Sequence, residues 1–314
     1  MRHTLVLYTT KYGTTAEIAR QMALVLGPAR ALPVDEFGAL KREADFVVLA
    51  APVYGDVLDP RMIEFARSQR EWLLQRPMAL LCVALAPQRW QDYLAPLAEL
   101  LGESVAWSGG LGGRLDMQRL DAQDRAALQH WQRSTGMETA TVDRVDPAKV
   151  VEAALSIKGL KDTPAVAAPS ADLKAQVEGF LRAHNTCTLV TGHGTHVRGT
   201  PIEYSYHEGA LYLLSEGGEK FAHLLLNPRV SLAIYDPYVG MARLAGLQLS
   251  GRAQVLEPGS AEYAEALALK DLTPEQVAAM PLTLNALKVT LEQAEFLWSG
   301  FVDLGYDVRQ ILRF

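Results

Sequence analysis

The sequence predicts a two-domain protein of the α/β plus β-barrel class, in which a doubly wound five-stranded parallel sheet precedes a small antiparallel barrel. Three observations lead to this prediction. The chain has 314 residues, 49% of them hydrophobic, which is enough for two domains that each bury a core. The first half alternates short apolar runs with amphipathic helix patterns, as parallel sheets with covering helices do. The second half contains short β-type runs separated by glycine turns, which is typical of a small barrel.

Apolar runs of strand length recur through the first half. The run 46–51 contains only apolar residues, as a strand buried on both faces of a sheet requires. The predicted strands are residues 5–8, 31–34 (the weakest pattern), 46–51, 78–85 and 104–108. The predicted helices are residues 15–26, 61–74, 90–101, 122–133 and 147–157. Gly27 and Pro28 end the first helix, and Pro147 suits the first position of the last.

A change of composition marks the domain boundary. Residues 161–171 contain two prolines and no amphipathic period, so we expect a linker there between domains at residues 1–160 and 172–314. In the second domain the predicted strands are residues 187–191, 200–206, 210–214, 230–235, 247–255 and 287–291. The predicted helices are residues 172–184, 260–269 and 274–279.

Composition excludes several classes of protein. The chain has 30 Lys and Arg against 36 Asp and Glu, so it lacks the surplus of positive charge with which proteins bind nucleic acid. Its two cysteines, Cys82 and Cys187, lie in apolar runs, which favours a reducing compartment over a disulfide scaffold. No run approaches the roughly 20 apolar residues of a membrane-spanning helix, and the N-terminus lacks a signal-peptide pattern. We therefore expect a cytoplasmic protein without an integral membrane segment.

The stretch between the first strand and the first helix, residues 9–15 (TTKYGTT), is the strongest functional signal. A phosphate there would meet the first-turn amides, the positive end of the helix dipole and several hydroxyl donors. Gly13 permits the tight turn that brings backbone N–H groups close to a ligand. Thr14 and Glu17 also fit a capping box, so a purely structural role stays open. The candidate phosphate-binding residues are Thr9, Thr10, Lys11, Tyr12, Gly13, Thr14 and Thr15.

This loop, together with residues 47–55, 107–111 and 134–141, resembles the flavodoxin superfamily. The similarity is greatest to the flavodoxin-like protoporphyrinogen IX dehydrogenase family, in which the loop is one residue longer and carries a basic residue, as Lys11 does here. The resemblance implies a sheet of strand order 2-1-3-4-5 and an FMN whose phosphate lies in the loop. It also implies that a second loop packs against the flavin ring, with Tyr54 stacking on it and Gly55 as a flexible peptide. The residues of that second loop are Pro52, Val53, Tyr54 and Gly55.

The glycine-rich run at residues 109–113 lies at the end of the fifth predicted strand. It does not match the dinucleotide-binding pattern of glycines and does not open a helix of that kind. We expect it to form a mobile loop near the edge of the flavin.

The second half resembles the pyridoxamine 5′-phosphate oxidase-like FMN-binding split barrel, through residues 200–204, 211–215, 217–220 and 227–231. The resemblance implies that Lys220 holds a flavin phosphate, with Ser215 and Arg198 as further candidates, and that the protein is a homodimer through the split barrel. One residue departs from the pattern. Glu219 stands where many flavin-binding members have Ser or Thr, so the barrel is expected to bind FMN differently, to bind haem or another anionic ring, or to bind nothing.

These features favour an FMN-dependent oxidoreductase or electron-transfer flavoprotein, with up to two flavin sites and a small-molecule or protein redox partner. No catalytic residue is then required, because the flavin carries the redox chemistry itself. A non-catalytic haem- or flavin-binding protein or redox sensor is the alternative, and a protoporphyrinogen IX dehydrogenase is the third candidate. We expect no metal site, because His193 and His196 lack a third ligand nearby.

Overall fold

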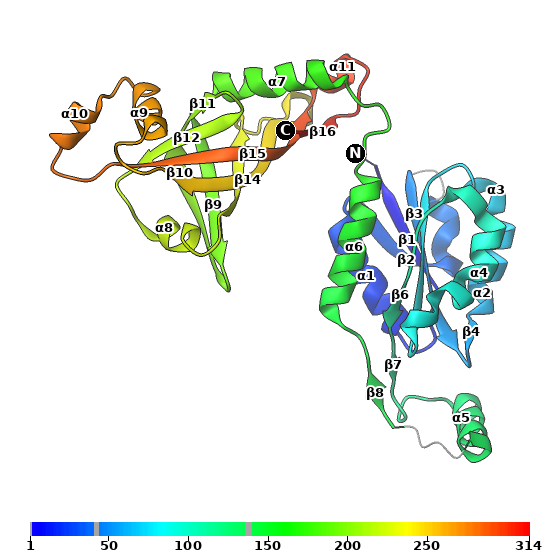
Figure 1. Cartoon of the computed structure of the whole chain (residues 1–314). Coiled ribbons are helices and arrows are strands. Elements are labelled where there is room, and N and C mark those ends of the chain that lie inside the picture. Colours follow the sequence, from blue (N-terminus) through cyan, green and yellow to red (C-terminus); the bar gives the residue numbers. More distant parts are fainter. Residues whose placement is uncertain (1, 41–43, 136–139) are drawn as a thin grey trace. The chain divides into compact units, whose positions relative to one another are not determined.

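The computed structural model describes residues 2–40, 44–135 and 140–314. The chain divides into two compact units, residues 1–162 and 163–314 (Figure 1). Among the described residues, no helix combines the length and the apolar character that crossing a lipid bilayer demands.

A parallel sheet with the strand order β2-β1-β3-β5-β6 forms the centre of the first unit, and this order confirms the prediction. The parallel strands are β1 (Thr4–Tyr8), β2 (Ala29–Pro33), β3 (Phe46–Tyr54), β5 (Met78–Ala84) and β6 (Val105–Gly112). The short β4 (Val57–Leu58) turns back antiparallel to β3. The whole of β5 is buried, as the unbroken apolar run predicted.

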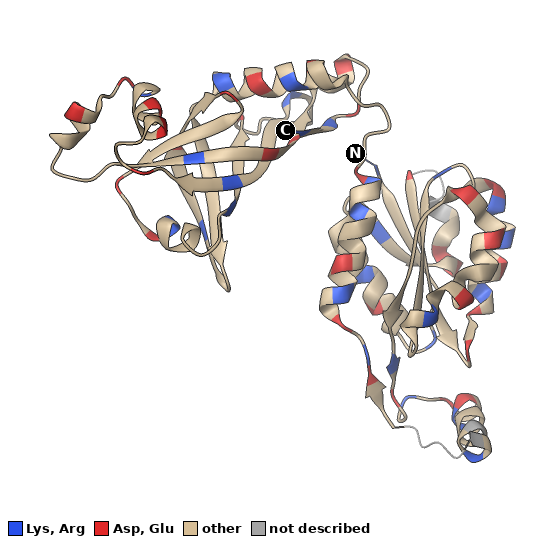
Figure 2. Cartoon of the chain, in the orientation of Figure 1, with Lys and Arg blue, Asp and Glu red and all other residues tan. Residues whose placement is uncertain are grey.

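Helices cover both faces of this sheet (Figure 1). One face packs against α1 (Thr14–Leu26) and α6 (Pro147–Lys161), and the other against α2 (Pro60–Ser68), α3 (Arg70–Leu73) and α4 (Trp90–Leu101). Neighbouring residues of a strand point to opposite faces of the sheet. Val6 packs on the face that α1 covers, whereas Leu5 and Leu7 pack on the face that α4 covers. Charged residues lie mainly on the helices and connections, and the central strands are almost free of them (Figure 2).

After β6 the chain leaves the sheet before it returns as α6. This segment, which we call the excursion, comprises β7 (Arg114–Leu115), α5 (Ala122–Thr135) and β8 (Val142–Asp143), and β7 and β8 pair antiparallel. Within the motif 134–141 that contributed to the predicted resemblance, residues 136–139 lie outside the described part of the chain.

The prediction of a mobile loop at residues 109–113 is wrong, because residues 109–112 belong to β6. The glycines are required by close backbone neighbours. A Cβ at Gly110 would lie 2.4 Å from the Pro87 carbonyl oxygen, and one at Gly112 would lie 1.8 Å from the Arg144 carbonyl oxygen. The glycines therefore let two connections pack directly on the edge strand.

The segment between the units is shorter than the predicted linker of residues 161–171. Lys161 ends α6, and α7 (Ser170–Ala183) begins at Ser170. The buried Lys161 ammonium donates hydrogen bonds to the carbonyls of Leu26 and Gly27 at the end of α1, which explains why α6 continues to this residue. Periodicity along the chain cannot reveal such a bond to a distant helix.

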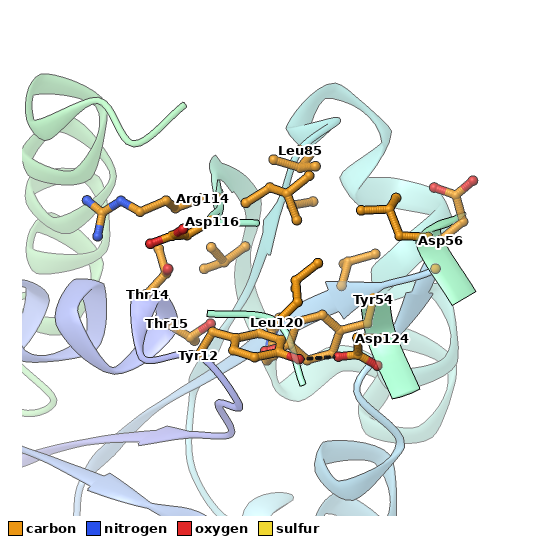
Figure 3. A pocket seen from close by; sticks show the side chains of 18 of the residues that line it. Tyr12, Thr14, Thr15, Tyr54, Asp56, Leu85, Arg114, Asp116, Leu120 and Asp124 are labelled. Carbon is orange, nitrogen blue, oxygen red and sulfur yellow. Dashed lines mark hydrogen bonds between the residues drawn. The ribbon is translucent and has the colours of Figure 1, made fainter. Parts of the chain in front are cut away.

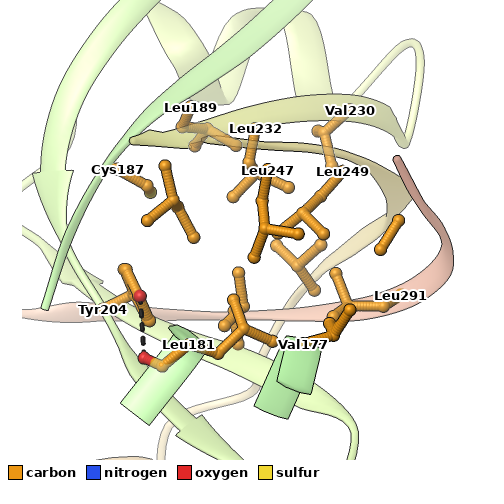
Figure 4. Packing of buried hydrophobic residues seen from close by; sticks show 14 of the residues in the cluster. Val177, Leu181, Cys187, Leu189, Tyr204, Val230, Leu232, Leu247, Leu249 and Leu291 are labelled. Carbon is orange, nitrogen blue, oxygen red and sulfur yellow. Dashed lines mark hydrogen bonds between the residues drawn. The ribbon is translucent and has the colours of Figure 1, made fainter. Parts of the chain in front are cut away.

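The second unit is a curved antiparallel sheet that confirms the predicted split barrel, with strand order β10-β9-β13-β14-β15-β12-β11 and β16 beside β15. Its strands are β9 (Thr186–His193), β10 (His196–Glu203), β11 (Ser205–His207), β12 (Ala210–Ser215), β13 (Arg229–Tyr235), β14 (Ala245–Val255), β15 (Asn285–Trp298) and β16 (Arg309–Arg313). Side chains from the sheet and from α7 fill its core, where the Tyr204 hydroxyl donates a hydrogen bond of 2.8 Å to the Leu181 carbonyl (Figure 4).

Shorter helices connect these strands. They are α8 (Glu219–Leu224), α9 (Ala261–Ala268), α10 (Pro274–Ala278) and α11 (Gly300–Asp303). The predicted strand 200–206 is divided at Tyr204, whose amide donates to the Asn185 carbonyl. The predicted strand 287–291 is only part of the first half of β15.

Candidate functional site

A cavity of about 490 Å³ opens in the first unit at the carboxyl ends of β1, β3 and β5 (Figure 3). The sheet order reverses here, because the chain places β2 on one side of β1 and β3 on the other. Crevices at such switch points are the usual ligand sites of open α/β sheets. Three segments supply most of the lining: the start of α1, the β3–β4 turn and the excursion.

The start of α1 presents free backbone donors to this cavity. Gly13 is its N-cap residue with φ +94°, and among the described residues no side chain caps the helix. The predicted alternative of a capping box therefore does not form, and Glu17 instead accepts a hydrogen bond from Arg114. The first amides of a helix have no acceptor within it, so the first turn, beside the cavity-lining Thr14 and Thr15, offers N–H groups to a ligand.

The loop before α1 is held in place from two sides. The Thr10 hydroxyl accepts a hydrogen bond of 2.9 Å from the Gly13 amide, and Arg61 donates one of 3.1 Å to the Thr10 carbonyl. Arg61 is itself fixed by a 2.6 Å ion pair with the buried Asp59. Burial pushes the pKa of Asp59 upward, but the hydrogen bonds and charge of Arg61 outweigh this effect and hold it below its ordinary value. Thr9, at the end of β1, is buried beneath the loop.

Lys11 and Tyr12 point toward the excursion. The Lys11 ammonium forms ion pairs of 2.8 Å with Asp121 and 2.7 Å with Asp124. These carboxylates raise the pKa of Lys11. The Tyr12 hydroxyl donates a hydrogen bond of 2.5 Å to Asp124 (Figure 3). Tyr12 and Asp124 both line the cavity, whereas the charge of Lys11 is balanced by the excursion.

All four residues of the second predicted loop, Pro52, Val53, Tyr54 and Gly55, line the cavity. The Tyr54 hydroxyl accepts a hydrogen bond of 3.1 Å from the Lys11 amide, and burial raises its pKa. The Tyr54 and Tyr12 rings meet edge to face, with centroids 6.0 Å apart. The two predicted loops are therefore in direct contact.

Gly55 and Asp56 form the two-residue turn between β3 and β4, with φ values of +56° and +62°. Two successive left-handed residues are typical of a tight hairpin turn. The Asp56 carboxylate accepts a hydrogen bond of 3.1 Å from the Tyr93 hydroxyl and lies 3.4 Å from Arg89. The turn is thus tied to α4 and to the connection before it.

The excursion supplies cavity residues that sequence reasoning missed: Arg114, Leu115, Asp116, Arg119, Leu120, Asp124, Ala127 and Leu128. The helix at residues 122–133 was predicted, but its contact with the loop of residues 9–15 spans more than a hundred residues of chain. No local pattern carries that information.

In the second unit the three predicted residues lie around the turn before α8. The Lys220 ammonium donates a hydrogen bond of 2.5 Å to the Gly217 carbonyl, and the Ser215 hydroxyl donates one of 3.2 Å to the same carbonyl. Burial, together with the nearby charge of Arg198, lowers the pKa of Lys220. Arg198 forms an ion pair of 2.6 Å with Glu219. The carboxylate that departs from the family pattern is therefore paired with one of the candidate cations.

His193 and His196 are paired opposite each other at the β9–β10 turn. In the part of the chain that the structure describes, no group of three or more His, Cys, Asp or Glu side chains is arranged to hold a metal ion.

Two family models match separate parts of the chain. The model of the flavodoxin domain matches residues 5–141, and that of pyridoxamine 5′-phosphate oxidase matches residues 173–298. The chain is a flavodoxin-like domain fused to a pyridoxamine 5′-phosphate oxidase-like domain. Both matches support a flavin as the cofactor. No curated protein matches the sequence significantly.

Several solved structures resemble part of the chain. A putative pyridoxamine 5′-phosphate oxidase from Listeria innocua is 22% identical, covers 40% of this chain and 98% of its own, and has a TM-score of 0.34. A FAD-binding protein from Mesorhizobium loti is 19% identical over 38% of this chain and 90% of its own, with a TM-score of 0.31. The haem storage protein HutZ from Vibrio cholerae is 14% identical over 38% of this chain and 90% of its own, with a TM-score of 0.33.

Proposed function

We propose that the flavodoxin-like domain binds FMN in the cavity at the ends of β1, β3 and β5, and that the protein is an FMN-dependent oxidoreductase or electron-transfer flavoprotein. The observation that carries this proposal is the uncapped start of α1, whose first-turn amides stand beside Thr14 and Thr15 at the switch point of the sheet. A phosphate group there would accept hydrogen bonds from those amides and gain from the helix dipole.

The residues present fit the remainder of the cofactor. The cavity volume of about 490 Å³ lies within the range of roughly 300–1,000 Å³ usual for ligand sites. Tyr54, Pro52, Leu120 and Leu128 line the cavity, so the first two would form a wall for the ring and the two leucines of the excursion would shield it from water. When bound, the flavin would supply the redox chemistry. The chain's own residues bind and orient it, and Arg61 keeps the phosphate-binding loop in position through the Thr10 carbonyl.

Flavin content and a titration with FMN test the binding. The purified full-length protein is expected to show a flavin visible spectrum, or to acquire one when FMN is added. Thr15→Val keeps the shape of this buried side chain and removes its hydroxyl, so FMN affinity should fall about tenfold, the loss expected for a hydrogen bond to a charged group. A protein that takes up no added FMN would overturn the proposal.

Electron transfer is tested separately on the loaded protein. Anaerobic reduction by NADH, NADPH or a reduced flavin, followed by reoxidation with a quinone or a one-electron protein acceptor, should proceed faster than with free FMN. Protoporphyrinogen is included as a donor, because the third candidate function predicts its oxidation. If no donor and acceptor pair exceeds the rate of free FMN, the protein stores or senses the flavin, which is the non-catalytic alternative.

We further propose a second flavin site in the barrel domain, at Ser215 and Lys220, in a homodimer through that domain. Lys220 is only 7% exposed, and its ammonium donates to the Gly217 carbonyl. When a phosphate binds, Lys220 would exchange this neutral acceptor for an anionic one, which binds an ammonium more strongly. Val197, Leu225 and Leu226 leave large apolar surface uncovered, which supports the dimer.

The stoichiometry of bound flavin decides whether this second site exists. The wild-type protein should hold two flavins per chain, and Lys220→Gln should hold one. A stoichiometry of one in both proteins would remove the second site. Light scattering reports the oligomeric state, and a monomer at every concentration would remove the dimer.

A further inference from the structure

Three cations surround the start of α1, and two of them are balanced by carboxylates. Lys11 is paired with Asp121 and Asp124, as described above. Arg114 forms ion pairs of 3.3 Å with Glu17 and 2.7 Å with Asp143. The positive charge of each of these two cations is therefore already balanced by two carboxylates.

Arg119 is the third cation, and it is differently placed. It lines the cavity, and its Nη2 atom lies only 3.8 Å from the position that a Cβ on Gly13 would take. The Arg119 backbone is fixed by a hydrogen bond of 3.1 Å from its amide to the Asp116 carbonyl. Within the described ranges of the chain, no carboxylate forms an ion pair with its guanidinium.

The two excursion carboxylates that line this part of the cavity have their own partners. Asp116 accepts a hydrogen bond of 3.0 Å from the Gln118 amide, and Asp124 accepts those of Lys11 and Tyr12. Their negative charge still opposes an anion, so a phosphate in the loop needs a cation close to it. Arg119 is available for this role at the Gly13 turn.

We propose that Arg119, which the excursion brings to the Gly13 turn, binds the phosphomonoester of the cofactor and sets a preference for FMN over riboflavin. This inference rests on the proposed function of the cavity. A guanidinium can bind two phosphate oxygens at once, while the first-turn amides of α1 bind the others. Because Arg119 belongs to the excursion, the same contact attaches the excursion to the phosphate-binding loop when the cofactor is bound.

The test compares FMN with riboflavin, which lacks the phosphate, on the full-length protein. Arg119→Gln should lower FMN affinity about 10- to 100-fold, the loss expected for a charge-assisted bond, and should change riboflavin affinity by less than about twofold. Arg133→Gln is the matched control, since Arg133 lies on α5 and bonds the Gln129 carbonyl one turn back. It removes the same charge from the same excursion and should leave the affinities for both ligands unchanged.

Added salt provides a second readout. Because the Arg119 side chain is exposed, salt should weaken FMN binding more in the wild-type protein than in Arg119→Gln. Arg119→Lys keeps a charge and should recover part of the FMN preference.

Each outcome bears on one claim. If FMN binds the wild-type protein and Arg119→Gln behaves like the Arg133 control, the inference is wrong and the proposed function stands. If Arg119→Gln weakens FMN and riboflavin equally, Arg119 has a structural role and the inference is again wrong. If Lys11→Gln alone removes the preference, the phosphate cation is Lys11. Failure of the wild-type protein to bind either flavin removes the proposed function itself.

Discussion

Gly13→Ala is the sharpest test of how the loop before α1 works. Gly13 has φ +94° and ψ −16°, a left-handed conformation that costs an L-residue roughly 1–2 kcal/mol. The added methyl group has room, because its nearest neighbour is the Arg119 Nη2 atom at 3.8 Å, an ordinary contact distance. The whole cost is therefore in the backbone, and the free energy of unfolding should fall by about 1–2 kcal/mol.

The same backbone strain at residue 13 should also lower the affinity for FMN. If the alanine loop relaxes in the free protein, the bond from the residue 13 amide to the Thr10 hydroxyl is lost, and FMN must restore the left-handed turn when it binds. Affinity would then fall by up to about 5- to 30-fold, which is 1–2 kcal/mol.

Thermal unfolding of the full chain and FMN titration measure the two effects. The transition of the flavodoxin-like domain should move down by about 2–8 °C. Gly38→Ala is the control, because its φ is outside the left-handed range and no atom lies within 4 Å of the added Cβ. If Gly13→Ala matches this control in both stability and FMN affinity, the turn does not require a left-handed residue and our account of the loop is incorrect.

Three further predictions concern interactions that hold the first unit together. Gly112→Ala places a Cβ 1.8 Å from the Arg144 carbonyl oxygen, so it should destabilise the first unit by about 3 kcal/mol, measured by chemical denaturation; unchanged stability would contradict the close approach. Lys161→Met leaves the carbonyls of Leu26 and Gly27 at the end of α1 without their charged donor and should cost about 2–3 kcal/mol in the same assay, with no loss indicating that the bonds contribute nothing. Asp59→Asn tests pH dependence. The folded pKa of Asp59 is below its ordinary value, which is near 3.9. The stability that the carboxylate contributes is therefore complete above the ordinary pKa and is lost as the pH falls through the folded pKa. The stability difference between wild type and Asp59→Asn should thus be constant near neutral pH and shrink below about pH 4, and a difference that grows with acid would reverse the sign of the argument.

Much of this architecture follows from local patterns in the sequence. Unbroken apolar runs such as residues 46–51 identify strands buried on both faces, because only the interior strands of a covered sheet can be apolar throughout. The threonine-rich stretch of residues 9–15 identifies the turn into α1, since threonines and a glycine between a strand pattern and a helix pattern are typical of such a turn. The order of the sheet came from the resemblance of these motifs to a known family, and the structure confirms it.

Local patterns were misleading where a neighbour from far along the chain decides the conformation. Residues 109–113 have the composition of a loop, but Gly110 and Gly112 are glycines because the Pro87 and Arg144 carbonyls pack against the strand. Thr14 and Glu17 have the spacing of a capping box, but Glu17 pairs with Arg114 and the helix start stays open.

The sequence by itself determined most strands and helices of both domains and the loop of residues 9–15, because periodicity and turn chemistry act over a few neighbouring residues, while the loop with Tyr54 came from the family resemblance. Only the tertiary structure decided that the excursion lies against the first loop, that Asp121 and Asp124 take the charge of Lys11, and that Arg119 stands at the Gly13 turn. Ion pairs between residues more than a hundred positions apart form only after the sheet has brought the ends of β1 and β6 to the same edge, so no window of sequence contains them.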